Sequence, residues 1–441
     1  MLKLSVKRVK HMKNKIIKVD YLARVEGEGG LSIKVVEGKI VELNFNIFEP
    51  PRFFEAFLRG RHFSEVPDIT ARICGICPVA YQMSSINAIE RAFGIEVSEP
   101  IKLLRRLIYC GEWLESHALH VFLLHAPDFL GYEDALQMAK DHSSIVQMGL
   151  RLKKIGNEIM RIVGGREIHP INIRVGGFYK LPLKSELKEL VEPLKWSVDA
   201  CIRTVRFVSR FSFPEFERHY EFVALQNEGK YAIEEGRIVS NKGIDIDVSE
   251  YEDNFYEEQV SHSTALHSVV KGRGGYLTGP VARFNLNFDK LTQTSQEIAK
   301  EAGIEKGTNN PFKSIIVRAI EMLYVCEEAL RIIENYEEPD KSVVNVQPRV
   351  GIGYGCTEAP RGILYHRYRF DNEGLVLDAK IVPPTSQNQK SIEEDLYEFI
   401  SGRLNLSKEK LTWQCEQAIR NYDPCISCST HFLRLNIVKE E

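Results

Sequence analysis

Two Cys-x-x-Cys pairs constrain this chain more than any other feature of its sequence. Cys74 and Cys77 lie in ARICGICPVAYQ, and Cys425 and Cys428 lie in DPCISCSTH, near the opposite end of the 441 residues. Such spacing lets both thiolates of a pair face one ion, and four thiolates suit zinc, nickel, copper(I) or an iron–sulfur cluster. A shared site would require the two ends of the chain to meet around a buried metal.

The composition excludes several other classes of protein. The chain is 44% hydrophobic and 27% charged, and its 58 basic and 61 acidic residues give a formal net charge of −3. This balance is typical of a globular protein and gives no electrostatic reason to expect a nucleic-acid partner. We find no secretory signal and no apolar run of the roughly 20 residues that a membrane span needs. We therefore expect a cytoplasmic protein whose paired cysteines bind metal rather than form disulfides.

The apolar periodicity predicts a mainly helical α+β fold, a long-helix bundle core with small peripheral β-sheets. Alternation predicts strands over residues 15–47, and residues 346–384 are predicted as strand, turn and strand. After a short helix in FFEAFLRGR, a loop is expected to lead into the first cysteine pair. The predicted long helices are residues 78–95, 99–125, 143–163, 184–212, 310–335 and 390–422.

We expect residues 1–441 to form one unit with five parts. In chain order these are a β region at 15–48, a helical core at 49–213, a β-rich insertion at 214–288, helical and β segments at 289–431 that close the metal site, and a tail at 432–441.

Several motifs follow one another in a fixed order along the chain. They are RVEG at 24–27, RICGIC at 72–77, SHALH at 116–120, GGREIHPINIRVGG at 164–177, GPVARFN at 279–285, EAPRG at 358–362 and DPCISCSTH at 423–431. From about Val19 to His431 the chain resembles the large, catalytic subunit of the nickel–iron hydrogenases. The resemblance implies that fold and the reversible heterolytic cleavage of dihydrogen. The alternatives are a non-catalytic zinc scaffold and a relative of the quinone-module subunits of respiratory complex I, which lack the full cysteine set.

The resemblance assigns the four cysteines to a nickel–iron centre. It implies that Cys74 and Cys425 are terminal nickel ligands, and that Cys77 and Cys428 bridge nickel to an iron that carries cyanide and carbon monoxide. Heterolytic cleavage requires a Lewis acid and a base that accepts the proton. By resemblance, that base is the Cys425 thiolate.

Three further roles near this centre follow from the resemblance. Glu26 would relay the proton toward solvent, whereas its simpler alternative is an ion pair with Arg24. Arg361 would donate hydrogen bonds to a cyanide, since a guanidinium presents a fixed fork of donors. Pro360 would stiffen the approach of Arg361, and Asp423 would hold its guanidinium; otherwise Arg361 is a turn residue in a surface salt bridge.

A second metal site and a histidine pair complete the candidate residues. By resemblance, Glu55, His431 and the backbone carbonyl of Leu364 would bind a hard divalent ion, usually magnesium. His117 and His120 lie on one predicted helix face, and we expect them to be a satisfied core pair rather than metal ligands.

The sequence departs from the usual family pattern at three positions. Tyr81 replaces a histidine that many members carry, as in cytoplasmic multisubunit hydrogenases that exchange electrons with NADP or NAD. Ser116 stands where many members have aspartate. Pro384 occupies the position whose N–H usually donates to a cyanide, and because proline has no N–H, the hydroxyl of Thr385 or Ser386 is expected to donate instead.

The resemblance also implies partners. We expect an iron–sulfur small subunit, with FAD, NAD(P) and ferredoxin-like electron transfer on further subunits. A maturation endopeptidase is expected to cut after His431 once nickel is in place and to remove residues 432–441.

Overall fold

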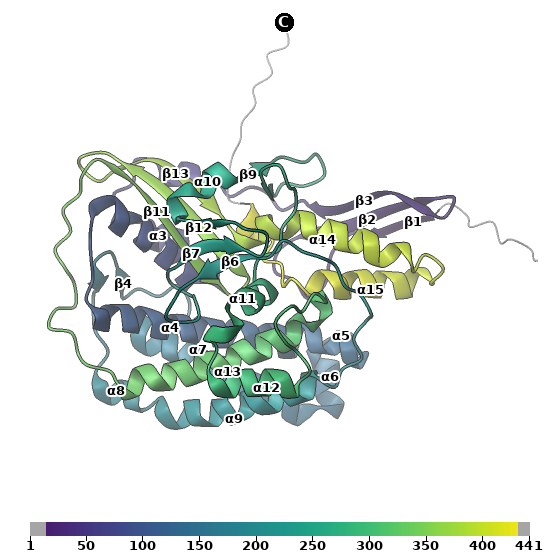
Figure 1. Ribbon diagram of the computed structural model, residues 1–441, viewed down its shortest axis with the longest axis horizontal. Coiled ribbons are helices and arrows are strands. Elements are labelled where there is room, and N and C mark those ends of the chain that lie inside the picture. The colour runs from purple at the N-terminus through teal and green to yellow at the C-terminus, as the bar shows by residue number, and fades with distance from the viewer. Residues whose placement is uncertain (1–14, 431–441) are drawn as a thin grey trace, which may run out of the picture.

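A three-stranded antiparallel sheet begins the part of the chain that the computed structural model describes, residues 15–430. Its strands are β1 (Lys15–Val19), β2 (Gly29–Val36) and β3 (Lys39–Ile47), in that spatial order. Alternation along β2 buries Leu31, Ile33 and Val35 on one face. The sheet extends to one side of the molecule (Figure 1) and matches the strands predicted at 15–47.

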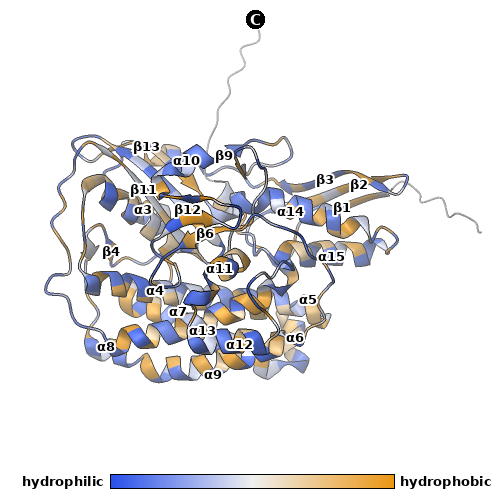
Figure 2. Cartoon of the chain, viewed as in Figure 1, coloured by the Kyte–Doolittle hydropathy of each residue, from blue (hydrophilic) through white to orange (hydrophobic). Residues whose placement is uncertain are grey.

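A bundle of long helices forms a layer that lies below the strands in the view of Figure 1. Its members are α4 (Glu99–Ala118), α7 (Ser143–Gly164), α9 (Val191–Val208) and α13 (Ser314–Glu334). α4 packs against α7 and α13, and hydrophobic and hydrophilic residues alternate along the visible helices of this layer (Figure 2). Gly111 and Gly156 let α4 and α7 approach closely, because a Cβ on Gly111 would lie 2.8 Å from the Gly156 carbonyl oxygen.

Shorter helices surround this bundle. They are α1 (Phe54–Leu58), α2 (Val66–Ala71), α3 (Pro78–Phe93), α5 (Ala126–Leu130), α6 (Ala135–Asp141), α8 (Lys184–Lys188), α10 (Tyr251–Asn254), α11 (Pro280–Asn287), α12 (Gln293–Glu301), α14 (Pro384–Ser401) and α15 (Lys408–Arg420). α2 occupies the region predicted as a loop. Each of the helices predicted at 184–212 and 390–422 is in fact two helices. Pro193 and Pro384 lie in the first turns of α9 and α14, where the missing N–H needs no helical partner.

A second sheet of three antiparallel strands packs on α3. It contains β11 (Gly351–Ala359), β12 (Gly362–Phe370) and β13 (Val376–Val382), one strand more than was predicted for 346–384. β11 lies directly on the α3 backbone, since a Cβ on Gly353 would lie 1.8 Å from the Ala88 carbonyl oxygen. The remaining strands form small sheets: β4 (Ile173–Arg174) with β5 (Gly177–Phe178), β6 (Val223–Gln226) with β7 (Arg237–Ser240) and β8 (Asp245–Ile246), and β9 (Phe255–Glu258) with β10 (His267–Val270).

A π-helical segment, Leu119–His125, continues α4 and is followed by α5. Such wide turns are rare and often occur near functional sites. Here the Leu124 carbonyl accepts a hydrogen bond of 2.6 Å from Arg24 Nη1, which ties the RVEG segment to the helical layer.

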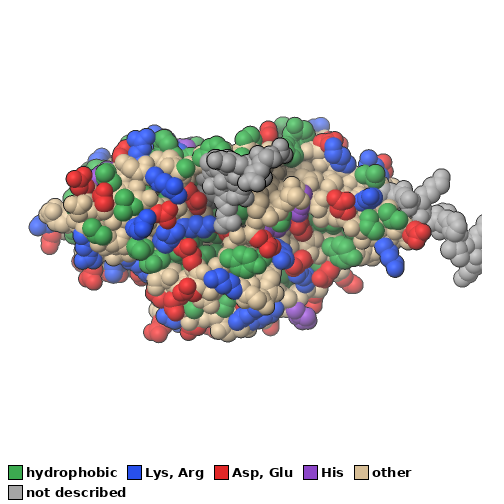
Figure 3. All heavy atoms as spheres, turned by 90° about the horizontal axis from the view of Figure 1, so that it is seen from above, with side chains coloured by type: hydrophobic (Ala, Val, Ile, Leu, Met, Phe, Trp, Pro, Cys, Tyr) green, Lys and Arg blue, Asp and Glu red, His purple; other side chains and the backbone are tan. Residues whose placement is uncertain are grey.

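None of the helices within residues 15–430 is long and apolar enough to span a bilayer. Acidic and basic side chains are interspersed on the face shown in Figure 3.

Candidate metal centre

The structure brings four cysteine thiols together from opposite ends of the chain. The Sγ atoms of Cys74 and Cys425 are 3.5 Å apart, and both lie within 4.8 Å of the Cys428 Sγ. Hydrogen bonds with these three thiols affect the pKa of Cys77, so its thiol faces the same cluster. All four residues are at most 4% exposed.

The first cysteine pair is placed by the start of α3. Cys77 immediately precedes this helix, and the backbone N–H groups of Ile76 and Cys77 donate to Cys74 Sγ at 3.3 and 3.2 Å. One turn later, the N–H groups of Val79 and Ala80 donate to the buried Glu112 carboxylate. The free N–H groups of the helix N-terminus are therefore all directed at acceptors, which fixes the turn that presents both thiols.

The second cysteine pair is held by the RVEG segment near the N-terminus. Glu26 forms a parallel backbone bridge with Cys425, and the Ile426 N–H donates to the Glu26 carbonyl at 2.9 Å. Gly27 has a φ of +86°, and a Cβ there would lie 2.8 Å from the Ile426 Cβ, so only glycine fits this contact.

The Glu26 carboxylate points to the thiol cluster. Its Oε2 lies 3.1 Å from Cys425 Sγ and accepts the Ser427 N–H at 3.1 Å. Arg24, the partner that the simpler alternative required, instead forms an ion pair of 2.5 Å with Asp128. Glu26 is therefore oriented by the cysteine segment and not by a neighbouring charge.

The thiol pKa values indicate that the cluster needs a cation. Burial acts to raise the pKa of Cys74, but hydrogen bonds from the other three thiols lower it well below its usual value. Burial raises the pKa values of Cys425 and Cys428 well above theirs. Four thiolates at this depth are tenable only when bound metal supplies positive charge, so the donor set fits a metal centre with soft ligands.

Arg361 lies beside this cluster with one donor group unused. Its Nε donates to the Asp423 carbonyl at 2.6 Å, and its Nη2 lies 3.1 Å from the Asp423 carboxylate. Although burial acts to lower the pKa of Arg361, Asp423 and the neighbouring thiolates raise it, so the guanidinium stays charged. Its Nη1 is buried without a hydrogen-bond partner among residues 15–430. That combination fits a small anionic ligand.

The three departures from the family pattern all lie in the buried core. Pro384 begins α14, and the Thr385 hydroxyl oxygen accepts the Cys425 N–H at 3.0 Å, which leaves the hydroxyl proton free to be donated. Ser386 instead donates to the Pro383 carbonyl. The hydroxyls of Ser116 and Tyr81 are buried without hydrogen-bond partners in the described part of the chain.

The proposed second metal site is described only in part, because His431 lies outside the described residues. Glu55 Oε1 accepts the Ile381 N–H of β13 at 2.8 Å. The Leu364 carbonyl on the neighbouring strand β12 accepts from the Ser84 hydroxyl at 3.0 Å. The fold thus brings Glu55 to the sheet that carries Leu364.

His117 and His120 are buried, as predicted, but each is satisfied at one ring nitrogen only, because the Nδ1 of both lacks a hydrogen-bond partner among residues 15–430. The Nε2 of His117 pairs with Glu321 at 2.9 Å, and the Nε2 of His120 pairs with the Arg420 carbonyl at 2.7 Å. Burial lowers the pKa of His117 to about 4, so the ring is neutral at pH 7.

The sequence analysis missed the acidic residues that support the centre. Glu112 accepts from the start of α3, and Glu49 accepts from the Ser427 hydroxyl at 2.9 Å. The available signal for Glu112 was a carboxylate inside an apolar helical run, which predicts a buried charge but not its partner.

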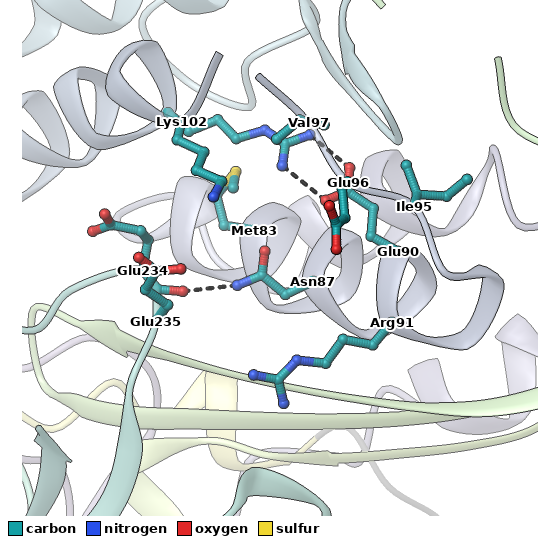
Figure 4. A pocket seen from close by; sticks show the side chains of 11 residues that line it. Met83, Asn87, Glu90, Arg91, Ile95, Glu96, Val97, Lys102, Glu234 and Glu235 are labelled. Carbon is teal, nitrogen blue, oxygen red and sulfur yellow. Dashed lines mark hydrogen bonds and ion pairs between the residues drawn. The ribbon is translucent and has the colours of Figure 1, made fainter. Parts of the chain in front are cut away.

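The surface pocket in Figure 4 is a different feature. It has a volume of about 450 Å³ and lies along the second half of α3, where Arg105 pairs with Glu90 and Asn87 donates to the Glu234 carbonyl. The cysteines are at the other end of α3 and do not line it.

Comparisons with known proteins give the family. The sequence model described as nickel-dependent hydrogenase matches residues 52–150 and 275–431. The chain is 35% identical to sulfhydrogenase 1 subunit alpha of Pyrococcus furiosus, with 95% of this chain and 98% of that protein covered. It is 28% identical to the NAD-reducing hydrogenase HoxS subunit beta of Cupriavidus necator, with 96% of both covered. The chain therefore belongs to the nickel-dependent hydrogenase family.

A solved structure agrees in fold. An NAD⁺-reducing [NiFe]-hydrogenase in the H2-reduced state superimposes with a TM-score of 0.87 at 26% identity, covering 95% of this chain and 99% of that one. The chain is thus a large, catalytic subunit of a nickel–iron hydrogenase, an oxidoreductase. The zinc-scaffold and quinone-module alternatives receive no support.

Proposed function

We propose that this chain activates dihydrogen in a cytoplasmic multisubunit hydrogenase that exchanges electrons with NAD(P), and that Cys425 and Glu26 carry the proton. The observation that supports this most directly is the 3.1 Å separation of Cys425 Sγ and Glu26 Oε2. A thiol and a carboxylate at hydrogen-bond distance are positioned for direct proton transfer.

The residues around the centre then have distinct tasks. When bound by Cys74, Cys77, Cys425 and Cys428, the nickel–iron centre supplies Lewis acidity and accepts electrons. Cys425 accepts the proton that cleavage releases and passes it to Glu26. The Ser427 N–H keeps the receiving carboxylate oxygen turned toward the thiol.

Arg361 and Thr385 are proposed to hold the cyanide ligands of the iron. The unused Nη1 of Arg361 supports this role, as does the free hydroxyl proton of Thr385. Asp423 fixes the Arg361 guanidinium. Pro360 limits backbone motion just before Arg361, and Pro384 limits it just before Thr385. Because Pro384 cannot donate, Thr385 takes over the contact that the backbone usually makes.

We also propose that Glu55, the Leu364 carbonyl and His431 bind a divalent ion, most simply magnesium. A carboxylate and a carbonyl are ordinary ligands for such an ion. An endopeptidase would remove residues 432–441 after the nickel is in place, and intact-mass analysis of active protein would detect the loss of these ten residues.

An iron–sulfur small subunit is the proposed first electron acceptor, with FAD, NAD(P) and ferredoxin-like centres on further subunits. Two relatives carry names of sulfhydrogenase and NAD-reducing hydrogenase subunits. Ile168, Ile171 and Tyr179 are about half exposed in and beside the GGREIHPINIRVGG segment. The Nδ1 of His169 in that segment lies 3.1 Å from Nη1 of Arg72, and Arg72 is two residues before Cys74. A partner subunit that covers these exposed side chains would therefore lie close to the metal centre.

Infrared spectroscopy and metal analysis of the purified complex test the proposed centre. We expect iron-bound cyanide and carbon monoxide bands, together with nickel and iron in about equal amounts. Zinc alone, without these bands, would contradict the proposal.

Glu26→Gln tests the proton relay. Glutamine keeps the shape and the contact with the Ser427 N–H but cannot carry the proton. We expect hydrogen–deuterium exchange to fall by about 10²–10⁴-fold while nickel and iron remain bound. The exposed Glu28→Gln is the matched control. Unchanged exchange in Glu26→Gln would remove Glu26 from the relay.

A further inference from the structure

A second cluster of metal-ligand side chains lies outside the cysteine centre. His262, His267 and Glu393 each place one ligand atom within 4.8 Å of the others. His262 lies in the loop between β9 and β10, His267 begins β10, and Glu393 lies in the middle of α14. Three separate parts of the fold therefore direct nitrogen and oxygen donors at one point.

The Glu393 carboxylate is held in place from several sides. Its Oε1 accepts the Phe45 N–H of β3 at 2.9 Å and lies 2.7 Å from His262 Nε2. The neighbouring charged groups are Glu394 and Lys390 on the same helix, and Lys390 lies 3.5 Å from Glu258 of β9. The carboxylate is therefore oriented before any ligand arrives.

His267 is the residue that a simple packing role explains least. It is only 2% exposed, and its Nε2 has no hydrogen-bond partner among residues 15–430. Its Nδ1 lies 4.0 Å from Glu393 Oε2, which is too far for a hydrogen bond.

The separations of the donor atoms lie on either side of those around a tetrahedral zinc ion, whose ligand atoms are roughly 3.4 Å apart. His262 Nε2 is 2.7 Å from Glu393 Oε1, and His267 Nδ1 is 4.0 Å from Glu393 Oε2. A bond from zinc to an imidazole nitrogen is about 2.0–2.1 Å long and one to a carboxylate oxygen about 2.0–2.2 Å, so the two together span at most about 4.3 Å. Small movements of both rings, His267 toward Glu393 and His262 away from it, would bring the two separations into tetrahedral range, with the ion replacing the hydrogen bond between His262 and Glu393. The side chains of His262 and Glu393 are 22% and 17% exposed, which leaves an approach for the ion and for a water as fourth ligand.

We propose that His262, His267 and Glu393 form a binding site for a divalent transition metal, zinc by its preference for two imidazoles and one carboxylate. The ion would fasten the β9–β10 region to α14. The first turn of α14 carries Thr385, which accepts the Cys425 N–H. The site is thus a clamp on the helix that supports the nickel–iron centre, and it takes no part in the reaction.

Cobalt(II) is a suitable probe because its spectrum reports the ligand type. The untagged mature chain, purified in its complex with the nickel–iron centre occupied, is treated with a mild chelator and then titrated with Co²⁺. We expect one equivalent to give d–d bands without a thiolate charge-transfer band, to be displaced by Zn²⁺, and to raise the thermal unfolding midpoint. Thiolate charge transfer alone would place the ion at cysteines and overturn the proposal.

Variants distinguish this site from the proposed site of Glu55, Leu364 and His431, whose ligands are also oxygen and nitrogen atoms. Glu393→Gln keeps an acceptor for the Phe45 N–H, and His267→Gln keeps a polar side chain. Each should weaken cobalt binding by at least about 100-fold, the upper cost of losing even an outer-shell partner. The exposed His219→Asn and the helix control Glu398→Gln should bind cobalt as the wild type does.

Glu55→Gln decides between the two sites. The cobalt bands should survive this substitution if they come from His262, His267 and Glu393. Bands that disappear in Glu55→Gln and persist in Glu393→Gln would overturn the inference without affecting the proposed hydrogenase function, which the infrared spectrum tests separately.

Discussion

Two buried arginines, Arg283 and Arg361, differ in how many of their donors are used. Arg283 directs its Nε and Nη2 at Glu321 and its Nη1 at Glu358, and it also binds the carbonyls of Ala359 and Pro360. Arg361 is equally buried, yet its Nη1 has no partner in the described chain. All the donors of Arg283 are used within the fold, whereas Arg361 keeps a buried guanidinium nitrogen for which the proposed function supplies an acceptor.

The two arginines are also connected. The carbonyls that Arg283 binds belong to the two residues immediately before Arg361. The satisfied network of Arg283, Glu321 and Glu358 therefore positions the backbone from which Arg361 reaches the thiol cluster. Support and chemistry lie side by side, and substitutions should separate them.

Cys425→Ala should have the largest effect on function. It removes the proposed proton acceptor and a metal ligand, so hydrogen oxidation should be lost completely and nickel content should fall. Cys415→Ala is the matched control, because Cys415 is a buried cysteine of α15 outside the thiol cluster. Retained hydrogen oxidation by Cys425→Ala would contradict the assignment of the centre.

Arg283→Met should have the largest effect on stability. It leaves the buried Glu321 and Glu358 carboxylates without their cation, which typically costs about 3–5 kcal/mol in the free energy of unfolding. Chemical denaturation measures this cost, with Arg206→Met at an exposed ion pair as the control that should change little. Equal unfolding curves for the two variants would show that the network does not support the fold.

Arg361→Lys should separate function from folding. Lysine retains the charge but not the fork of donors, and we expect hydrogen oxidation to fall by about 10²-fold, a usual cost of losing one preorganised donor. The cyanide bands should shift, while the unfolding curve should move less than in Arg283→Met. Unshifted bands would mean that Arg361 does not contact the cyanide.

The titration of His117, which pairs with Glu321 of this network, should make the free energy of unfolding depend on pH. The effect should be smaller than that of Arg283→Met. Burial lowers its pKa to about 4 from an ordinary 6.5, so between these values the unfolded chain binds more protons than the folded chain. The free energy of unfolding should fall as the pH drops from 6.5 to 4, by up to about 3 kcal/mol for this residue. In His117→Gln the free energy of unfolding should depend less on pH between 6.5 and 4. An unchanged pH dependence would show that His117 is not the group that causes it.

The elements predicted from periodicity were largely correct where the pattern was long. The helices at 78–95 and 143–163 appear as α3 and α7. α7 buries one apolar face for several turns, whereas α3 is buried on nearly every side. The helix α2 was missed because six residues provide too little periodicity, and its role comes from packing against α3. The third strand of the β11–β13 sheet was missed for a similar reason, since strand pairing depends on partners far along the chain.

At the site, the motifs predicted which residues bind the metal and carry the proton, and the tertiary structure determined which of these residues contact one another. The sequence placed Glu26 and Cys425 in separate motifs, but their 3.1 Å contact exists only because the RVEG segment bridges the cysteine segment. The metal-binding roles of Glu55, Leu364 and His431 remain a prediction. The cluster of His262, His267 and Glu393 had no spacing signal, because α14 supplies its carboxylate from more than a hundred residues away.

By itself the sequence determined the donor chemistry of this protein, since four cysteines in two short pairs have few uses other than soft-metal binding. Only the tertiary structure decided which charges are satisfied and which are left open. The physical reason is that a side chain's identity sets what it donates or accepts, whereas burial and the partners brought to it by folding set whether that capacity is already used.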